Sequence, residues 1–387
     1  MPTNQNDIIH LAPGAILDAL AGDDLIFWSG GNAHVDGGAD GFDSNPYQPF
    51  DADRGIATGD MVHVGGDRGV SVVWSDWNAG KIRMGGDTLT MTGIERVYGS
   101  AGNDTIRAGA VTSFGPDGHG ISIFAGAGND NIVGSRSNDV IDPGAGNDTV
   151  FAGNGYDFVN SSTGNDLVYG GAGDDNIRWG LGDAHWHNPG NDTIFGGDGH
   201  DLINVWVWDG GTSNGVGTPG GRVTITTIRA DGAFAGTATV GTGDGEARLR
   251  FQGFELGWTH MGDDTLDASG ARVMGGLGIN WNGRWGDDRL IGSSGADTLV
   301  GDEGRDTIAG GAGNDALWIG RDRTADGDVD TIIFRAGDGQ DTIYGFGSED
   351  VLDLGGRDYH ARETSAGTLL DLGGGDTILL AHVLDFV

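Results

Sequence analysis

The chain has 387 residues, enough for a sizeable core or several domains, and 78 of them are glycine. Its formal net charge of −36 comes from 57 acidic and 21 basic residues, which makes nucleic acid and anionic membranes poor partners. There is no cysteine, which excludes disulfides and thiolate sites, and no apolar run reaches the ~18–20 residues of a membrane helix.

Residues 1–98 are predicted to form an N-terminal β cap with imperfect repeats. Ala19–Phe27 (ALAGDDLIF) has the glycine, the aspartate and the apolar residue of a unit that recurs along the chain. Strand-like runs at Met61–Val64 and Val70–Trp74 are separated by glycine-rich turns. The first full unit follows at Gly99–Arg107 (GSAGNDTIR).

Residues 99–204 contain a period of nine. Six consecutive units run from Ala125 to Arg178, and each has aspartate at its sixth position and a β-branched residue at its eighth. A fixed short period predicts a solenoid. Two units make one coil, with a strand on each side and coils stacked ~4.8 Å apart. The glycine-rich half of each unit suits a backbone that turns through positive φ.

The sixth-position aspartates supply hard oxygen ligands, and the turn carbonyls can supply more, which is the set that calcium prefers. Stacked coils would align these carboxylates along an edge, where they would repel one another. A cation between the coils would remove that repulsion.

Beyond the first block the period is interrupted twice. It slips at Trp179–Trp186, which we interpret as a bulge in one coil. Residues 205–258 break the repeat, and their alternation predicts the antiparallel strands of a β insert, which either projects from the solenoid or joins two solenoid blocks. The repeat resumes over residues 259–344, and residues 345–387 are predicted to form a C-terminal cap over the open end of the solenoid.

The repeat resembles the GGxGxDxUx nonapeptide of RTX (hemolysin-type) proteins, best at Gly170–Arg178 (GGAGDDNIR) and Gly310–Trp318 (GGAGNDALW). The resemblance implies several calcium ions that bridge adjacent coils. It also implies export by type I secretion to the outside or surface of a Gram-negative bacterium, and the apolar end at Asp385–Val387 resembles a type I signal. The expected fold is all-β: a parallel β-roll or β-helix solenoid in two blocks, with an antiparallel β insert and capping ends.

The expected calcium ligands are the sixth-position aspartates and the glycines of the best-matching turns. These are Asp104, Asp130, Asp139, Asp148, Asp157, Asp166, Asp175, Asp192, Asp201, Asp264, Asp288, Asp297, Asp306, Asp315 and Asp341, with Gly126, Gly128, Gly144, Gly146, Gly171, Gly173, Gly197, Gly199, Gly311 and Gly313. Some units depart from the motif, as where Ser137 replaces a glycine. Glycine is also missing at the second position of Ser161–Tyr169, His187–Phe195 and the units within Gly283–Ala309. Such turns are expected to bind calcium weakly or to hold none.

No catalytic residue is predicted. Gly211–Gly215 (GTSNG) matches GxSxG, but the surrounding residues lack the helix that a nucleophile elbow needs. His185 and His187 have no HExxH context, so we interpret them as turn residues. Paired carboxylates for glycoside chemistry are hard to exclude, but the regular aspartate spacing already has an explanation.

Tryptophans gather around the slip, the insert and the second block. We interpret them as packing for irregular coils, and the alternative is an exposed sugar-stacking surface. They are Trp179, Trp186, Trp206, Trp208, Trp258, Trp281, Trp285 and Trp318.

The resulting hypothesis is a secreted calcium-binding protein that folds on binding extracellular calcium, because binding energy here is folding energy. Its role would be structural, through surface contacts. The alternative is a polysaccharide-binding module or a polysaccharide-modifying enzyme that uses the insert. Expected partners are calcium, and either cell-surface or matrix polysaccharide or further copies of the chain.

Overall fold

The computed structural model describes residues 6–19, 21–38, 60–113, 115, 119–180, 189–206, 219–242, 245–320 and 327–383. Over these ranges every regular element is a β-strand. The chain divides into two compact units, Met1–Arg178 with Pro189–Gly199 and Trp179–Asn188 with His200–Val387. Within the described ranges, no helix is long and apolar enough to cross a membrane.

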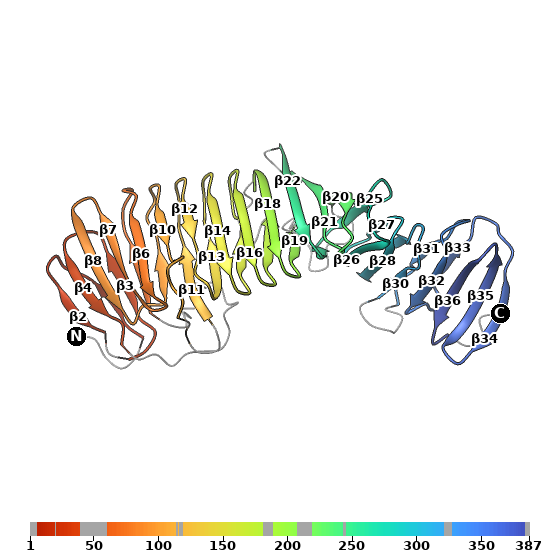
Figure 1. The fold of residues 1–387 in the computed structure, drawn as a ribbon, viewed down its shortest axis with the longest axis horizontal. Coiled ribbons are helices and arrows are strands. Elements are labelled where there is room, and N and C mark those ends of the chain that lie inside the picture. The colour runs from red at the N-terminus through yellow and green to blue at the C-terminus, as the bar shows by residue number, and fades with distance from the viewer. Residues whose placement is uncertain are drawn as a thin grey trace. The chain divides into compact units, whose positions relative to one another are not determined.

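The first unit is a stack of coils whose strands lie side by side, from red to yellow-green in Figure 1. One of its sheets is entirely parallel. Its strands in order are β1 (Ile8–His10), β3 (Leu25–Trp28), β5 (Met61–Val64), β9 (Arg96–Tyr98), β11 (His119–Phe124), β13 (Asn138–Asp142), β15 (Phe158–Asn160) and β17 (Asn176–Gly180).

The other sheet of this unit is parallel except for one antiparallel meander, β8–β7–β6. Its strands in order are β2 (Ile16–Asp18), β4 (Ala33–Asp36), β8 (Asp87–Thr92), β7 (Ala79–Met84), β6 (Ser71–Asp76), β10 (Thr105–Arg107), β12 (Asn131–Val133), β14 (Thr149–Asn154), β16 (Leu167–Ala172) and β18 (Asn191–Asp198).

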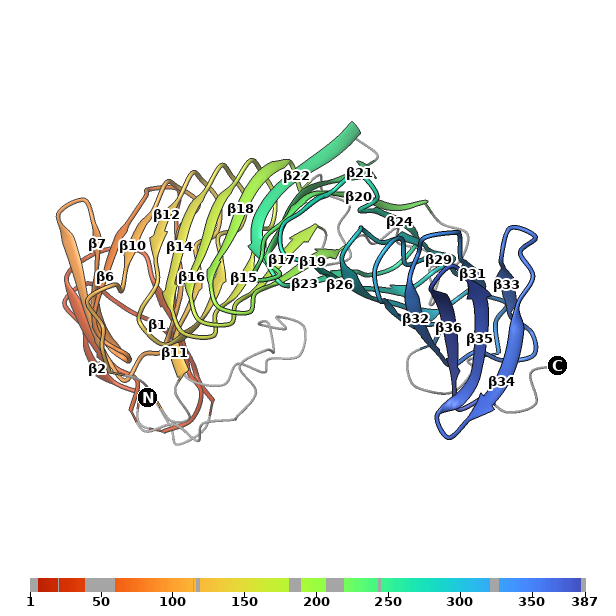
Figure 2. The ribbon, with the colours of Figure 1, turned by 45° about the vertical axis from the view of Figure 1, so that its right-hand side comes forward.

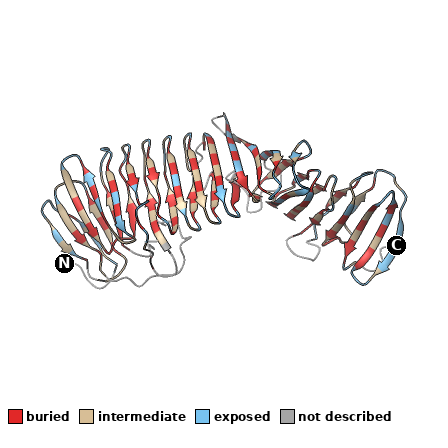
Figure 3. Cartoon of the chain, viewed as in Figure 1, coloured by how far each residue is buried: buried red, intermediate tan, exposed pale blue. Residues whose placement is uncertain are grey.

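The nine-residue period sets the register of these sheets. Ile132 on β12 pairs with Val150 on β14, and Val150 pairs with Val168 on β16, so two units make one coil as expected. These three side chains have no exposed surface. Burial therefore alternates along the strands (Figure 3). Each fully buried aliphatic side chain contributes about 1.5–3 kcal/mol to the core.

The second unit is also built from two sheets. One sheet contains β19 (Leu202–Trp206), β23 (Leu256–Thr259), β26 (Leu277–Trp285), β28 (Ala296–Glu303), β30 (Ala316–Trp318), β32 (Gln340–Tyr344), β36 (Asp376–Ala381), β35 (Gly367–Gly373) and β34 (His360–Thr364). The other contains β22 (Gly245–Phe254), β21 (Phe234–Thr242), β20 (Pro219–Ile228), β24 (Asp263–Asp267), β25 (Arg272–Val273), β27 (Arg289–Ile291), β29 (Thr307–Ala309), β31 (Thr331–Ile333) and β33 (Val351–Asp353).

The predicted antiparallel insert is present as β20, β21 and β22. It is built into the solenoid rather than projecting from it, because β20 also pairs in parallel with β24. The insert residues around Gly211–Gly215 lie outside the described residues, as do His185, Trp186, His187 and Trp208. Trp179 and Trp281 are fully buried, in line with their interpretation as packing residues.

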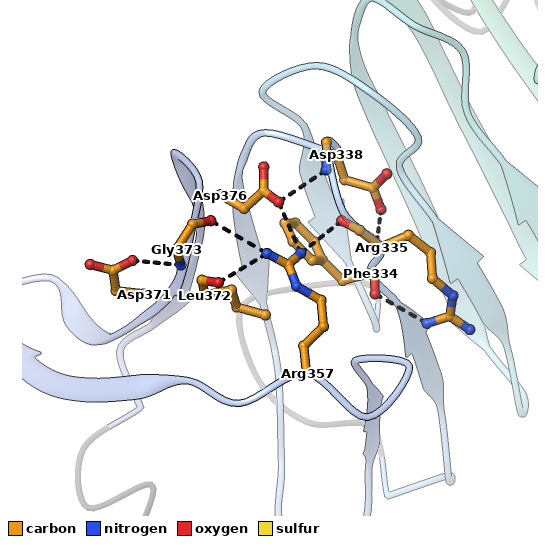
Figure 4. Close-up of polar contacts among 9 residues, drawn as sticks. Phe334, Arg335, Asp338, Arg357, Asp371, Leu372, Gly373 and Asp376 are labelled. Atoms are coloured by element: carbon orange, nitrogen blue, oxygen red, sulfur yellow. Dashed lines mark hydrogen bonds and ion pairs between the residues drawn. The ribbon is translucent and has the colours of Figure 1, made fainter.

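The C-terminal cap consists of β34, β35 and β36, at the blue end of the second unit (Figure 2). β36 pairs in parallel with β32, so the apolar end of the chain is a strand up to Ala381, whereas Asp385–Val387 lie outside the described residues. Arg357 ties this cap to the solenoid (Figure 4). Its guanidinium donates to the carbonyl oxygens of Arg335 and Leu372 at 3.1 and 3.0 Å and pairs with Asp376 at 2.9 Å.

Candidate metal centre

The sixth-position aspartates are stacked in columns along the turns of each unit. The main-chain N–H of Asp130 donates to Oδ1 of Asp148 at 2.7 Å, and that of Asp148 donates to Oδ1 of Asp166 at 2.8 Å. On the other sheet, the N–H of Asp139 donates to Oδ1 of Asp157 at 2.8 Å. One carboxylate oxygen of each aspartate thus replaces the β-ladder hydrogen bond that the turn interrupts.

The second unit contains the same columns, and all fifteen predicted aspartates are buried in the structure. The N–H of Asp288 donates to Oδ1 of Asp306 at 2.8 Å, and the N–H of Asp315 donates to Oδ1 of Asp341 at 3.0 Å. The sequence-predicted aspartates are therefore brought together as neighbours in consecutive coils, in more than one column.

The other carboxylate oxygen, Oδ2, differs from Oδ1 in its hydrogen bonding. In six of these aspartates it is buried and has no hydrogen-bond donor among the described residues: Asp130, Asp148, Asp157, Asp166, Asp288 and Asp315. Leaving a buried polar group unsatisfied costs about 1–3 kcal/mol, and more for a charged group. A cation bound beside each Oδ2 would remove this cost.

The pKa values of these carboxyl groups also reflect the cost of burying their charge. Burial raises the pKa of Asp157 to about 9, with the neighbouring carboxylates of Asp139 and Asp175 adding to the effect. Burial also raises the pKa of Asp166 to about 9, and the charge of Asp192 contributes. Without a positive charge nearby, these groups resist ionisation at neutral pH.

Glycine carbonyls line the turns next to the aspartates. A Cβ atom on Gly144 would lie 1.9 Å from the carbonyl oxygen of Gly126, and one on Gly146 would lie 1.6 Å from that of Gly128. Both positions also have positive φ, 88° and 148°. Glycine is required here because the carbonyl oxygens of consecutive coils point into the space that a side chain would fill. Carboxylate and carbonyl oxygens together form a donor set that suits calcium.

No group of three or more His, Cys, Asp or Glu side chains that could hold a metal ion occurs in the described ranges. An ion at these turns would therefore take most of its ligands from the main chain. Such a site would differ from one built from converging side chains, and the predicted turn glycines would contribute ligands beside the aspartates.

Sequence reasoning missed several acidic residues that occupy the same place in the columns. Oδ1 of Asp60 accepts the N–H of Asp24, and Oδ1 of Asp330 accepts the N–H of Asp306, each at 2.7 Å. Glu255 takes the aspartate's place in one coil, where its Oε2 accepts the N–H of Asp201 at 2.7 Å. Chain insertions shift the nine-residue count before Asp60 and Asp330. An acidic residue two positions before a buried apolar residue is the remaining signal.

Comparison with known proteins bears on these turns. A family model described as the RTX calcium-binding nonapeptide repeat, in four copies, matches residues 90–110, 124–159, 151–183, 188–205, 282–317 and 333–356. No curated protein matches the chain. Among solved structures, the chain is similar to the extracellular lipase LipA from Serratia marcescens, with 19% identity and a TM-score of 0.19. The alignment covers 67% of this chain but only 38% of the lipase, and a likeness at this level carries no argument about activity.

Proposed function

Because this chain contains RTX calcium-binding nonapeptide repeats, we propose that calcium bound at its turns holds the stacked coils together and drives their folding. The observation that carries the proposal is the set of buried Oδ2 atoms with no donor among the described residues, at turns whose glycines lie against main-chain carbonyl oxygens of the adjacent coil. When calcium is bound there, it supplies positive charge between carboxylates that otherwise repel.

The proposed ligands are the sixth-position carboxylates and the main-chain carbonyls of the turn glycines. Asp148 and Asp166 with Gly128, Gly146 and Gly164 form one such set, in consecutive coils. The aspartate side chain also fixes the turn through Oδ1, so each carboxylate would serve two purposes. It accepts a hydrogen bond from one coil and offers its second oxygen to the ion.

The place of action follows from the affinity expected for such sites. Extracellular calcium modules bind with dissociation constants of roughly 10⁻⁴–10⁻³ M. At the low free calcium of a cytosol, the column charges would remain uncompensated and the chain would stay unfolded. We propose that the protein folds after export, by type I secretion from a Gram-negative bacterium, and functions outside the cell or on its surface.

The role we favour is that of a structural scaffold rather than a catalyst or a sugar-binding module. The rings of Phe151, Tyr169 and Phe195 stack face to face, with neighbouring centroids 4.9 Å apart, so both faces of the Tyr169 ring are covered. The ring of Trp258 is covered by the guanidinium of Arg284 at 4.1 Å. Aromatic faces that already have partners support a structural role.

The test is circular dichroism of the EDTA-stripped full chain during a calcium titration, with magnesium as the control. We expect a cooperative gain of β structure with calcium alone, because magnesium demands octahedral geometry and gives up its water reluctantly. A chain that is already β-rich in EDTA, and that calcium does not change, would contradict the proposal. Activity on polysaccharides that insert substitutions abolish would instead support the enzymatic alternative.

A further inference from the structure

We propose that three turns with serine at the second position work without calcium, because the serine hydroxyl takes the place of the ion. These serine turns are Gly99–Asp104 (GSAGND), Gly134–Asp139 (GSRSND) and Gly292–Asp297 (GSSGAD). The proposal rests on the proposed function, since it divides the turns into those that need an ion and those that do not.

In each serine turn, both oxygens of the aspartate have donors from the serine. The Oγ of Ser100 donates to Oδ1 of Asp104 at 2.7 Å, and the N–H of Ser100 donates to Oδ2 at 2.8 Å. Ser293 does the same for Asp297, at 3.0 Å from Oγ and 2.6 Å from the N–H. None of these carboxylates has the donorless Oδ2 found at Asp130, Asp148, Asp157, Asp166, Asp288 and Asp315.

Ser135 makes the same pair of bonds to Asp139, with its Oγ 2.7 Å from Oδ1. The serine hydroxyl is also an acceptor. In this turn the N–H of Ser137 donates to Oγ of Ser135 at 3.0 Å, and the N–H of Gly295 does so to Ser293 at the same distance. The serine hydroxyl thus accepts a hydrogen bond from the turn backbone and donates one to the carboxylate, so the polar groups of the turn are satisfied without a cation.

The backbone conformation at the second position also differs between the serine turns and the other turns. Second-position glycines have positive φ, such as 107° at Gly126 and 92° at Gly311. Non-glycine residues elsewhere keep that conformation, since φ is 60° at Ser162, 81° at Arg284 and 82° at Asp302. The three turn serines are absent from the positive-φ residues of the described chain.

Ser162 shows that serine alone does not make a serine turn. It also occupies the second position of its unit, but its Oγ donates to Asp142 at 2.6 Å instead of to its own sixth-position aspartate. That aspartate, Asp166, retains a buried Oδ2 with no donor. The two kinds of turn are therefore separated by hydrogen bonding and backbone conformation, and not by residue type.

The serine turns also share a position in the columns. The Oδ1 atoms of Asp104, Asp139 and Asp297 accept an N–H from an apolar residue of the preceding coil, whereas most of the other predicted aspartates accept the N–H of an aspartate. The donors are Val70 at 2.7 Å, Ile121 at 2.8 Å and Ile279 at 2.6 Å.

An ion at these three places would have lost the carboxylate from the preceding coil. Each serine turn is thus the first member of a column of stacked aspartates. It needs no ion of its own, and the first ion-bound coil can stack on it.

The deciding experiment is a crystal structure of the full chain grown in calcium, with long-wavelength anomalous data that locate each ion. We expect anomalous peaks at Asp148 and Asp166 and none at Asp104, Asp139 or Asp297. A peak at any serine turn would overturn this inference while leaving the proposed function intact. No peak at any turn would overturn the proposed function itself.

A measurement in solution tests the same inference about the serine turns. Ser135→Ala removes the hydroxyl of a serine turn, and Asp157→Asn removes the charge of a proposed ligand from the turn Ala152–Asp157 in the next coil, which has Gly153 at its second position. We expect calcium per chain, measured by metal analysis after gel filtration, to be unchanged for Ser135→Ala and to fall for Asp157→Asn. A lower calcium content in Ser135→Ala would show that the serine binds the ion, and the inference would then be wrong.

Discussion

The main-chain N–H of Asp148 donates to Oδ1 of Asp166 in the next coil at 2.8 Å, and Oδ2 of Asp166 is left buried without a donor among the described residues. Oδ1 therefore stabilises the fold through a hydrogen bond, whereas Oδ2 would gain a partner only when a cation is bound. This division leads to a substitution whose effect should change sign with calcium.

Asp166→Asn retains the Oδ1 acceptor and removes the charge. In calcium, we expect the variant to unfold more easily by about 3 kcal/mol, because a buried ion loses a charged partner. In EDTA, it should favour the folded state relative to wild type, because burial raises the pKa of Asp166 to about 9 and an ionised group there opposes folding.

The measurement is urea unfolding of both proteins in calcium, and circular dichroism of both in EDTA to compare how much β structure each retains, at neutral pH. Asp174→Asn is the matched control, since Asp174 is an exposed fifth-position aspartate in a neighbouring unit. Effects of the same sign in both conditions would argue against an ion at Oδ2.

Acid should partly replace calcium. Burial raises the pKa of Asp157 and Asp166 to about 9 in the folded chain, so the folded state binds protons more tightly than the unfolded state. The stabilisation is complete below the ordinary aspartate pKa of ~3.9 and is lost as pH rises toward 9. We expect the EDTA-treated protein to gain β structure between about pH 9 and pH 5 by circular dichroism. The calcium-loaded protein should change little over this range, and a metal-free chain that unfolds on acidification in it would contradict the prediction.

Two glycines with nearly equal φ separate backbone strain from steric crowding. Gly144 has φ 88° and its added Cβ would meet the Gly126 carbonyl oxygen at 1.9 Å, whereas Gly337 has φ 91° and nothing within 4 Å. Gly337→Ala should cost only the conformational penalty of about 1–2 kcal/mol. Gly144→Ala should cost clearly more and should raise the calcium concentration needed for folding. Equal losses of thermal stability in the two variants would mean that the carbonyl contact is unimportant.

Much of this fold could be predicted from the sequence because a period of nine fixes both the turn and the register. The aspartates at the sixth position and the buried residues at the eighth, such as Ile132 and Val150, occupy the predicted places. Asp60 and Asp330 were missed because insertions of variable length separate them from the repeat before.

The division between the serine turns and the other turns could not be predicted from the residue types alone. Ser100 and Ser162 both occupy the second position of a unit, and only their hydrogen-bond partners distinguish them. The partner of Ser100 lies in its own unit, whereas Asp142, the partner of Ser162, lies in another unit, so the difference is a property of the stacked structure.

Arg357 is expected to secure the C-terminal cap independently of calcium. Its side chain is 22% exposed, and the guanidinium donates to three main-chain carbonyls besides pairing with Asp376, which also accepts the N–H of Gly337 at 2.9 Å (Figure 4). Because hydrogen bonds to charged groups are worth about 1.5–3 kcal/mol, Arg357→Met should lower the unfolding free energy of the calcium-loaded protein by about 2–3 kcal/mol. Arg362→Met, at an exposed position of β34, is the control and should have little effect. Hydrogen exchange would show faster opening of β35 and β36 in Arg357→Met alone, and equal protection of these strands in both variants would mean that Arg357 does not secure the cap.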